Sequence, residues 1–266
     1  MKPRKYSRIL LLVAVIASLF LSSCQPQSTT VRSASQPGTE LRVGITANAP
    51  PFAFKQAGTI TGLEPAFAAL LGEYLGKKVT LVEVPWEKQF DFLNSGKTDI
   101  IMSGMTITRQ RLMSVNFSKP YMRSGQIMLV HAKDRQLFAR GIESLMNKNY
   151  RIGTVTGTAS DLFISATING ANEIPFKEPQ EAVNALIAHD IDTFVYDAPV
   201  VCYYAASHQQ QKLLPVMVMG TEEYLGWAVR KNDTELLARL NQFVDHLDGQ
   251  GTLRQEIDYW IPYFNR

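Results

Sequence analysis

Two closely spaced arginines follow a turn that could hold an anion. The apolar run Ile100-Ile101-Met102 predicts the end of a buried strand, and Ser103-Gly104-Met105-Thr106 predicts a polar turn after it. Thr108 can cap a short helix whose first turn carries Arg109 and Arg111. The dipole at that end favours negative charge, so cations there make sense if the turn binds an anion. Backbone N–H groups and a guanidinium fork would meet on one carboxylate or phosphate. The alternative is two solvated arginines on a surface helix.

A carboxylate stands at the end of a second apolar run. Asp197 follows Phe194-Val195-Tyr196, which predicts a buried strand, and precedes Ala198-Pro199. A carboxylate in such a place must be paired or must lie in a cleft. The alternative role is a helix cap before Pro199, and one side chain can serve both roles.

A third segment carries an aromatic ring at the start of a short helix. Trp86, Phe90 and Leu93 recur at helical spacing before Gly96. A flat ring such as that of Trp86 suits aliphatic stems and cations. The alternative is that Trp86 is an ordinary core residue on the apolar face of this helix.

The elements that position these residues alternate between strands and helices. Gly62-Leu63-Glu64-Pro65 predicts a helix start with Glu64 as the cap and Pro65 at the first helical position. Gly76 is expected to end this helix. Such alternation predicts an α/β architecture with mainly parallel sheets, and two helices close the chain. The expected strands cover residues 41–45, 79–84, 100–102, 126–131, 150–155, 191–196, 212–218 and 224–229.

Two similar half-patterns are visible in this alternation. Each consists of a strand, a polar Gly/Thr turn and a helix start, at Gly104–Thr108 and at Gly157–Ser160. Ligands of open α/β sheets bind at such strand ends. Two sheets that face each other across a cleft would therefore bring both turns, with Thr158 and Ala159 in the second, onto one ligand.

Composition excludes several classes of function. The chain has 266 residues, of which 45% are hydrophobic and 19% are charged, so a packed core is feasible. Without the four basic residues among the first eight, 23 basic residues stand against 24 acidic ones, which argues against nucleic acid as a partner. Two cysteines and four scattered histidines form no disulfide framework and no metal-ligand set. We expect no metal and no cofactor.

The N-terminus has the pattern of a secretory leader. Residues 1–8 are basic, and the apolar run Ile9–Leu21 is too short to span a bilayer comfortably. Leu21-Ser22-Ser23-Cys24 resembles the bacterial lipobox, in which the cysteine is lipidated and becomes the new N-terminus. We therefore expect a signal peptide at 1–23, a lipidated Cys24, a flexible Ser/Thr/Gln/Pro-rich tether at 24–39 and a membrane-anchored extracytoplasmic domain. The alternative is an ordinary secretory signal with a chance cysteine.

One long motif resembles a known family. Asp99 is followed by Gly104-Met105-Thr106-Ile107-Thr108-Arg109-Gln110-Arg111 and by Phe117-Ser118-Lys119-Pro120-Tyr121. This order resembles solute-binding protein family 3, the amino-acid-binding proteins of ABC importers, over roughly residues 40 to 266. The resemblance implies a two-lobed type II periplasmic-binding-protein fold with two parallel-type sheets, helices and a hinge between the lobes. It also implies that the protein is a monomer. It divides the chain into lobe 1 (40–127 and 225–266) and lobe 2 (128–224), with crossovers near 126–130 and 221–228.

The same resemblance assigns roles to individual residues. It implies that Arg111, and not Arg109, clamps the ligand α-carboxylate, that Asp197 takes the α-ammonium and that Trp86 packs on the ligand. The other ligand-binding residues that we expect are Gly104, Thr106, Thr158, Ala159, Thr46, Asn48 and Phe52.

The chain departs from the family pattern where side-chain specificity is set. Thr46 and Ala49 stand where many members carry an acid and an aromatic ring. A cationic ligand side chain would therefore be desolvated without a partner there, which is costly. We expect a neutral, polar or moderately apolar amino acid, provided that Glu222 and Glu223 stay out of the pocket.

Three functions remain open at this point. The first is capture of a free amino acid and its delivery to an inner-membrane ABC permease by lobe closure, without covalent chemistry. The second is enzymatic, because the fold resembles that of cyclohexadienyl/arogenate dehydratases, and Glu222 or Glu223 could supply the general acid. The third is a lipoprotein that senses a ligand and reports it to a membrane partner.

Overall fold

The structure is a computed structural model that describes residues 38–146 and 149–262. The predicted leader, Cys24 and nearly all of the predicted tether lie outside these residues. Within them, no helix combines the length and the apolar character that are needed to cross a membrane.

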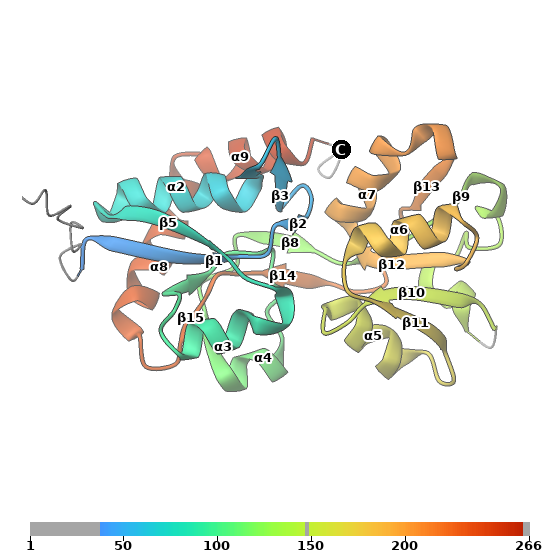
Figure 1. The fold of residues 1–266 in the computed structure, drawn as a ribbon, viewed down its shortest axis with the longest axis horizontal. Helices are drawn as coiled ribbons and strands as arrows, with labels where there is room; N and C mark the ends of the chain where they lie inside the picture. Colours follow the sequence, from blue (N-terminus) through green and yellow to red (C-terminus); the bar gives the residue numbers. More distant parts are fainter. Residues whose placement is uncertain (1–37, 147–148, 263–266) are drawn as a thin grey trace, which may run out of the picture. The chain divides into compact units, whose positions relative to one another are not determined.

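The first of two five-stranded sheets has the order β5-β1-β6-β15-β7. Strand β1 runs parallel to β5 and β6, whereas β15 runs antiparallel to β6 and β7. Helices α2 and α9 lie on one side of it and α3 and α4 on the other (Figure 1). The bounds are β1 Glu40–Ile45, β5 Lys78–Glu83, β6 Ile100–Ile101, β7 Val115–Phe117, β15 Ala228–Arg230, α2 Leu63–Leu75, α3 Gln89–Asn94, α4 Arg109–Ser114, α8 Thr234–Gly249 and α9 Thr252–Trp260.

The second sheet has the order β11-β10-β12-β9-β13. Strands β11, β10 and β12 are parallel, and β9 is antiparallel to both β12 and β13. Both sheets are therefore mixed, with a parallel part that matches the sequence-based expectation and an antiparallel part that it did not include. Helices α6 and α7 lie on one side and α5 on the other (Figure 1). The bounds are β9 Gln126–His131, β10 Arg151–Val155, β11 Asn172–Phe176, β12 Thr193–Asp197, β13 Leu213–Val216, α5 Ala159–Thr167, α6 Pro179–Ile187 and α7 Ala198–Ser207.

Two smaller sheets complete the described strands. Strands β2 Asn48–Ala49, β3 Ala53–Gln56 and β4 Thr59–Thr61 form a meander. Strands β8 Met122–Ser124 and β14 Glu223–Leu225 form an antiparallel ribbon, through which the chain passes from the first sheet to the second and returns. Short 3₁₀ turns η1 to η4 cover Trp86–Lys88, Ala132–Asp134, Gly141–Leu145 and Gln209–Gln211.

The last strand expected from the sequence, 224–229, is divided in the structure. Gly226 and Trp227 separate β14 from β15, because their backbone bonds to other partners. The Gly226 N–H donates to the Met105 carbonyl, and the Trp227 N–H donates to the hydroxyl of Ser118. The break lets one segment pair first with β8 and then with β6 and β7.

Helix α2 begins at Leu63, one residue before Glu64, which was predicted to be its N-cap. Gly62 is the N-cap, with a φ of 125°, and a Cβ there would lie 2.4 Å from the Phe52 carbonyl oxygen. Only glycine fits at this close approach. Glu64, predicted to be the cap, lies instead in the first turn and is completely buried. The prediction of a Gly76 end is confirmed, since Gly76 has the left-handed conformation typical of helix ends.

Candidate functional site

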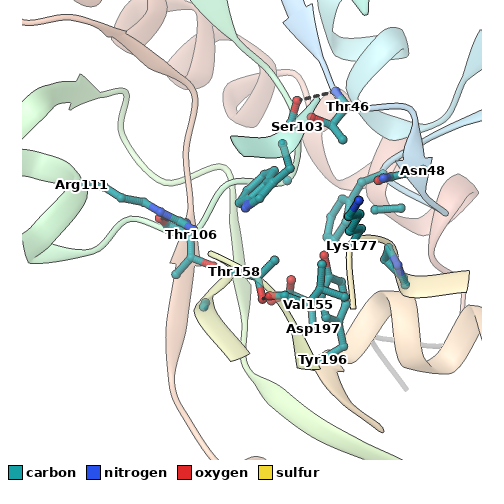
Figure 2. A pocket seen from close by; sticks show the side chains of 16 residues that line it. Thr46, Asn48, Ser103, Thr106, Arg111, Val155, Thr158, Lys177, Tyr196 and Asp197 are labelled. Carbon is teal, nitrogen blue, oxygen red and sulfur yellow. Dashed lines mark hydrogen bonds between the residues drawn. The ribbon is translucent and has the colours of Figure 1, made fainter. Parts of the chain in front are cut away.

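A pocket with about 490 Å³ of empty space, part of it open to solvent, lies at the strand ends of both sheets (Figure 2). All ten ligand-binding residues predicted from the sequence line it. The predicted turns after β6 and after β10 thus meet at one site. The lining residues are Thr46, Asn48, Ala49, Phe52, Trp86, Ser103, Gly104, Thr106, Arg111, Val155, Thr158, Ala159, Lys177, Pro179, Tyr196 and Asp197.

Arg111 faces this pocket because Thr108 begins α4. The Thr108 side chain accepts a hydrogen bond from the Arg111 backbone N–H at 3.2 Å, which confirms the predicted cap. The Arg111 side chain is buried, and its guanidinium donates to the carbonyl of Thr106 at 2.9 Å and to that of Gly157 at 3.2 Å. Arg109 is exposed. Arg111 therefore faces the pocket and Arg109 does not. The Arg111 guanidinium has further N–H groups that could bind an anion.

Trp86 forms a second link to the same carbonyl. Its Nε1 donates to the Gly157 carbonyl at 3.1 Å, and the Arg111 guanidinium lies over its ring at 5.2 Å from the centroid. Trp86 precedes α3 on the first sheet, whereas Gly157 follows β10 of the second. The two donors therefore hold the turn of the second sheet against the first. Trp86 also packs against the core at β6 and β7 and lines the pocket, while its contact with a ligand stays a prediction.

Asp197 ends β12 on the other side of the pocket. It occupies the N-cap position of α7, but its side chain makes no capping bond there. Its Oδ1 accepts instead from Gln126 Nε2 at 2.8 Å. Burial and the nearby Glu223 carboxylate together raise the pKa of Asp197 to about 7, against the opposing effects of the Gln126 hydrogen bond and of Arg111.

Gln126 connects Asp197 to a second carboxylate. Its Nε2 also donates to Glu223 Oε2 at 3.1 Å, and the hydroxyls of Thr106 and Thr221 donate to the same carboxylate at 3.0 and 2.7 Å. The Thr106 hydroxyl donates its hydrogen bond to Glu223, so it can only accept a hydrogen bond from a ligand. No local pattern in the sequence indicates Gln126, because the bridge joins residues up to 97 positions apart.

Neither acid singled out near the second crossover lines the pocket. Glu222 is exposed and pairs with Arg123 at 3.3 Å. It also accepts a hydrogen bond from Tyr224 at 2.8 Å. Glu223 lies behind Thr106 and is held by the three donors described above. The condition on which the neutral-ligand prediction depended therefore holds for both residues.

The wall at Thr46 is polar and already hydrogen-bonded. The Thr46 hydroxyl donates to the Val84 carbonyl at 2.9 Å and accepts from Gln89 Nε2 at 2.8 Å. The Thr46 N–H donates to Ser103, which also accepts from Gln89 at 3.1 Å. Ser103 and the buried Gln89 were not predicted as part of this wall. The network fixes a neutral surface there.

Gly104 must be glycine at its place in the first turn. Its φ is 64°, and a Cβ would lie 2.9 Å from the ring of Phe52. Its N–H donates to Glu64 Oε1 at 2.6 Å. The same carboxylate accepts from Tyr121 at 2.5 Å and from Trp227 Nε1 at 3.0 Å. Burial raises the pKa of Glu64 to about 7, although these three hydrogen bonds lower it.

The second turn is arranged by local hydrogen bonds. Thr158 is the N-cap residue of α5, and its hydroxyl donates to the Val155 carbonyl at 2.6 Å. The hydroxyls of Thr158 and Ser160 also lie 2.8 Å apart. Lys177 lines the pocket from the end of β11, next to α6, and was not predicted. In the sequence it is one lysine before a capping glutamate, which is a pattern typical of a surface turn.

The comparisons with known proteins identify the class. Residues 41–263 match the bacterial extracellular solute-binding proteins, family 3, and the chain belongs to this family. A probable histidine-binding protein of Neisseria gonorrhoeae is 29% identical over an alignment of 240 positions, which covers 88% of each chain. The cyclohexadienyl dehydratase of Pseudomonas aeruginosa is 23% identical over an alignment of 272 positions, which covers 98% of this chain and 97% of that one.

A solved structure agrees with this class. The crystal structure of an ancestral amino-acid-binding protein, a precursor of cyclohexadienyl dehydratase, matches with a TM-score of 0.77 and 34% identity. The match covers 84% of this chain and 95% of that chain. The fold is the type II periplasmic-binding-protein fold, as the family resemblance implied.

Proposed function

We propose that the protein binds a free amino acid outside the cytoplasm and delivers it to an ABC importer. The observation that carries this proposal is the pair formed by Arg111, on α4 between β6 and β7, and Asp197, at the end of β12 in the second sheet, which line one pocket. Opposite charges at one site suit a zwitterion, with its α-carboxylate on the guanidinium fork and its α-ammonium on the carboxylate. The family supports the importer as the partner.

Binding would be coupled to closure of two lobes. We assign residues 40–127 and 225–266 to one lobe and 128–224 to the other, with passage between them through the β8–β14 ribbon. The bonds from Arg111 and Trp86 to the Gly157 carbonyl describe contacts that closure makes. Closure removes water from the charge pairs and so strengthens them. The permease would then recognise the closed form of a monomeric binding protein.

A ligand screen tests this proposal. Thermal unfolding is measured with each of the twenty amino acids, and hits are confirmed by calorimetry. A ligand at a hundred times its dissociation constant is expected to add about 2.7 kcal/mol to the free energy of unfolding. If no amino acid shifts the unfolding transition, amino-acid binding is refuted.

An enzymatic role is the second candidate, and Asp197 is what favours it. A dehydratase on this fold needs a carboxylic acid in the pocket that can donate a proton. Asp197 lies there with a pKa of about 7, whereas Glu222 and Glu223 do not line the pocket. Incubation with arogenate and prephenate, followed by ultraviolet detection of the aromatic product, tests it. Product that depends on Asp197 would establish the enzyme, and its absence leaves binding as the function.

We further propose that Cys24 carries a lipid that anchors the protein to the membrane. The apolar run and Leu21-Ser22-Ser23-Cys24 support this assignment. Cys24→Ser is expected to move the protein from the membrane to the soluble fraction in cell fractionation. An unchanged distribution would show that the chain is retained by other means.

A further inference from the structure

We propose that Lys177 recognises a second carboxylate on the ligand, so that the bound compound is a dicarboxylic amino acid. This inference rests on the proposed function, in which Arg111 and Asp197 hold the α-carboxylate and the α-ammonium. It concerns the side chain that extends beyond those two groups. From the sequence we expected a neutral side chain, since no carboxylate was placed at that part of the wall to pair with a cationic one.

The balance of charge in the pocket is the first observation. Its lining contains two cations, Arg111 and Lys177, and one carboxylate, Asp197. A zwitterion pairs with Arg111 and Asp197 and leaves the ammonium of Lys177 without a counter-charge. A ligand that carries one additional negative charge matches all three groups. A cationic side chain would meet repulsion from Lys177.

The second observation is that Lys177 has no competing partner among the residues that the structure describes. Two carboxylates lie nearby in the sequence, and both are engaged at the start of α6. Glu178 accepts from the third N–H of the helix in a capping box. Glu181 accepts from the backbone N–H groups of Lys177 and Glu178 at 3.0 and 3.3 Å. The Lys177 backbone is thus held in place, while its Nζ makes no ion pair or hydrogen bond within that part of the chain.

The third observation is the position of Lys177 within the pocket. In the view of Figure 2, Lys177 lies on the side of the pocket away from Arg111, and Asn48 lines the pocket as well. Asn48, Ala49 and Pro179, which also line the pocket, are uncharged. Once Arg111 and Asp197 hold the α-carboxylate and the α-ammonium, Lys177 is the charged residue of this lining that remains for the ligand side chain. Lys177 is exposed and its ammonium is hydrated, so a ligand carboxylate would replace part of that water with a charge-assisted hydrogen bond.

Calorimetry on the full chain tests this assignment. Aspartate, glutamate and 2-aminoadipate are titrated alongside asparagine and glutamine, at a pH where all side-chain carboxylates are ionised. For the best-fitting length, the acid is expected to bind at least about tenfold more tightly than its amide. Lys177→Met keeps the length of the side chain and is expected to abolish this preference. Lys133→Met, an exposed lysine that lines none of the described pockets, is the matched control and should retain it.

The outcomes separate the inference from the proposed function. Tighter binding of a neutral amino acid than of every acid overturns the role of Lys177 and leaves amino-acid binding intact. An equal loss for acid and amide in Lys177→Met also overturns it, because a general packing role would act on both. No heat from any amino acid, in the panel or in the screen of twenty, refutes the proposed function itself.

Discussion

Arg109 and Arg111 stand two residues apart in one turn of α4, yet only Arg111 is buried at the pocket. Arg111→Ala is expected to reduce ligand affinity by roughly 2–5 kcal/mol, because the carboxylate would lose its charged partner in a desolvated site. Arg111→Lys should also bind weakly, since an ammonium cannot form the two parallel bonds of the fork. Calorimetry with the tightest ligand of the screen measures both. Arg109→Ala is the control, and a comparable loss there would contradict the assignment.

Gly104 provides a second test at the scale of single residues. Gly104→Ala places a methyl group 2.9 Å from the Phe52 ring in a backbone conformation that disfavours side chains. Gly96→Ala is the matched control, because Gly96 has a similar φ of 72° but open space around its Cβ position. We expect the control to lose about 1 kcal/mol of stability and to keep its ligand affinity. Gly104→Ala should lose more stability in urea unfolding and at least about tenfold in affinity. Equal losses of stability and affinity in the two variants would show that the turn at Gly104 can move to accommodate the methyl group.

The residues that the sequence predicted and those it did not differ in a physical way. Arg111, Gly104 and Thr158 belong to short motifs in which turn, cap and functional group lie within a few positions. Lys177 and Gln126 belong to the site only because folding brings them close to residues that are distant in the sequence, so no local pattern indicates them. The pocket needs both kinds, and only folding brings the second kind to it.

At the scale of elements, one buried carboxylate joins three segments. Glu64 on α2 accepts hydrogen bonds from Gly104 in the first turn, from Tyr121 before β8 and from Trp227 after β14. The ligand turn and both strands of the ribbon are therefore positioned by the same side chain. The sequence-based assignment of Glu64 as the N-cap was wrong, because Gly62 is the N-cap residue. Glu64 therefore lies in the first turn of α2, and its side chain is buried in the core.

The charge of Glu64 should make stability depend on pH. Its pKa is raised from 4.5 to about 7 in the folded state, so the folded protein binds the proton more tightly than the unfolded chain. The resulting stabilisation is complete below pH 4.5 and is lost as the pH rises through about 7, by about 3 kcal/mol. Glu64→Gln removes this titration, although its amide must place a donor against one of the three N–H or O–H groups.

Urea unfolding of the wild type and of Glu64→Gln at pH 5 and pH 8 isolates the contribution of Glu64 to the pH dependence of stability. The stability advantage of the wild type over Glu64→Gln is expected to shrink at pH 8. Asp197, whose pKa is also about 7, is present in both proteins and cancels in the difference. Glu73→Gln, an exposed glutamate on the same helix, is the control. A difference that does not change with pH would mean that Glu64 keeps one charge state throughout this range.

At the scale of the whole molecule, the arrangement of the sheets could be predicted only in part. Alternating strands and helices correctly indicated an α/β fold. The pairing of β9 with both β12 and β13, and the separation of β14 from β15, could not be predicted. Both depend on which distant strand offers free N–H and C=O groups at an edge. Local apolar runs such as 224–229 contain no information on that choice.

The bond from Trp86 to Gly157 gives the molecule an optical reporter of its own state. The chain has three tryptophans: Trp227 is fully buried, Trp260 packs against Phe54 and Tyr259, and Trp86 alone lines the ligand pocket. Separation of the two sheets would expose the indole of Trp86 to water and shift its fluorescence emission to longer wavelength. Saturating ligand should therefore shift the emission of the wild type to shorter wavelength, and Trp86→Phe should abolish that shift. A shift that persists in Trp86→Phe would place the signal elsewhere. Stopped-flow fluorescence could then time the closure of the unlabelled protein.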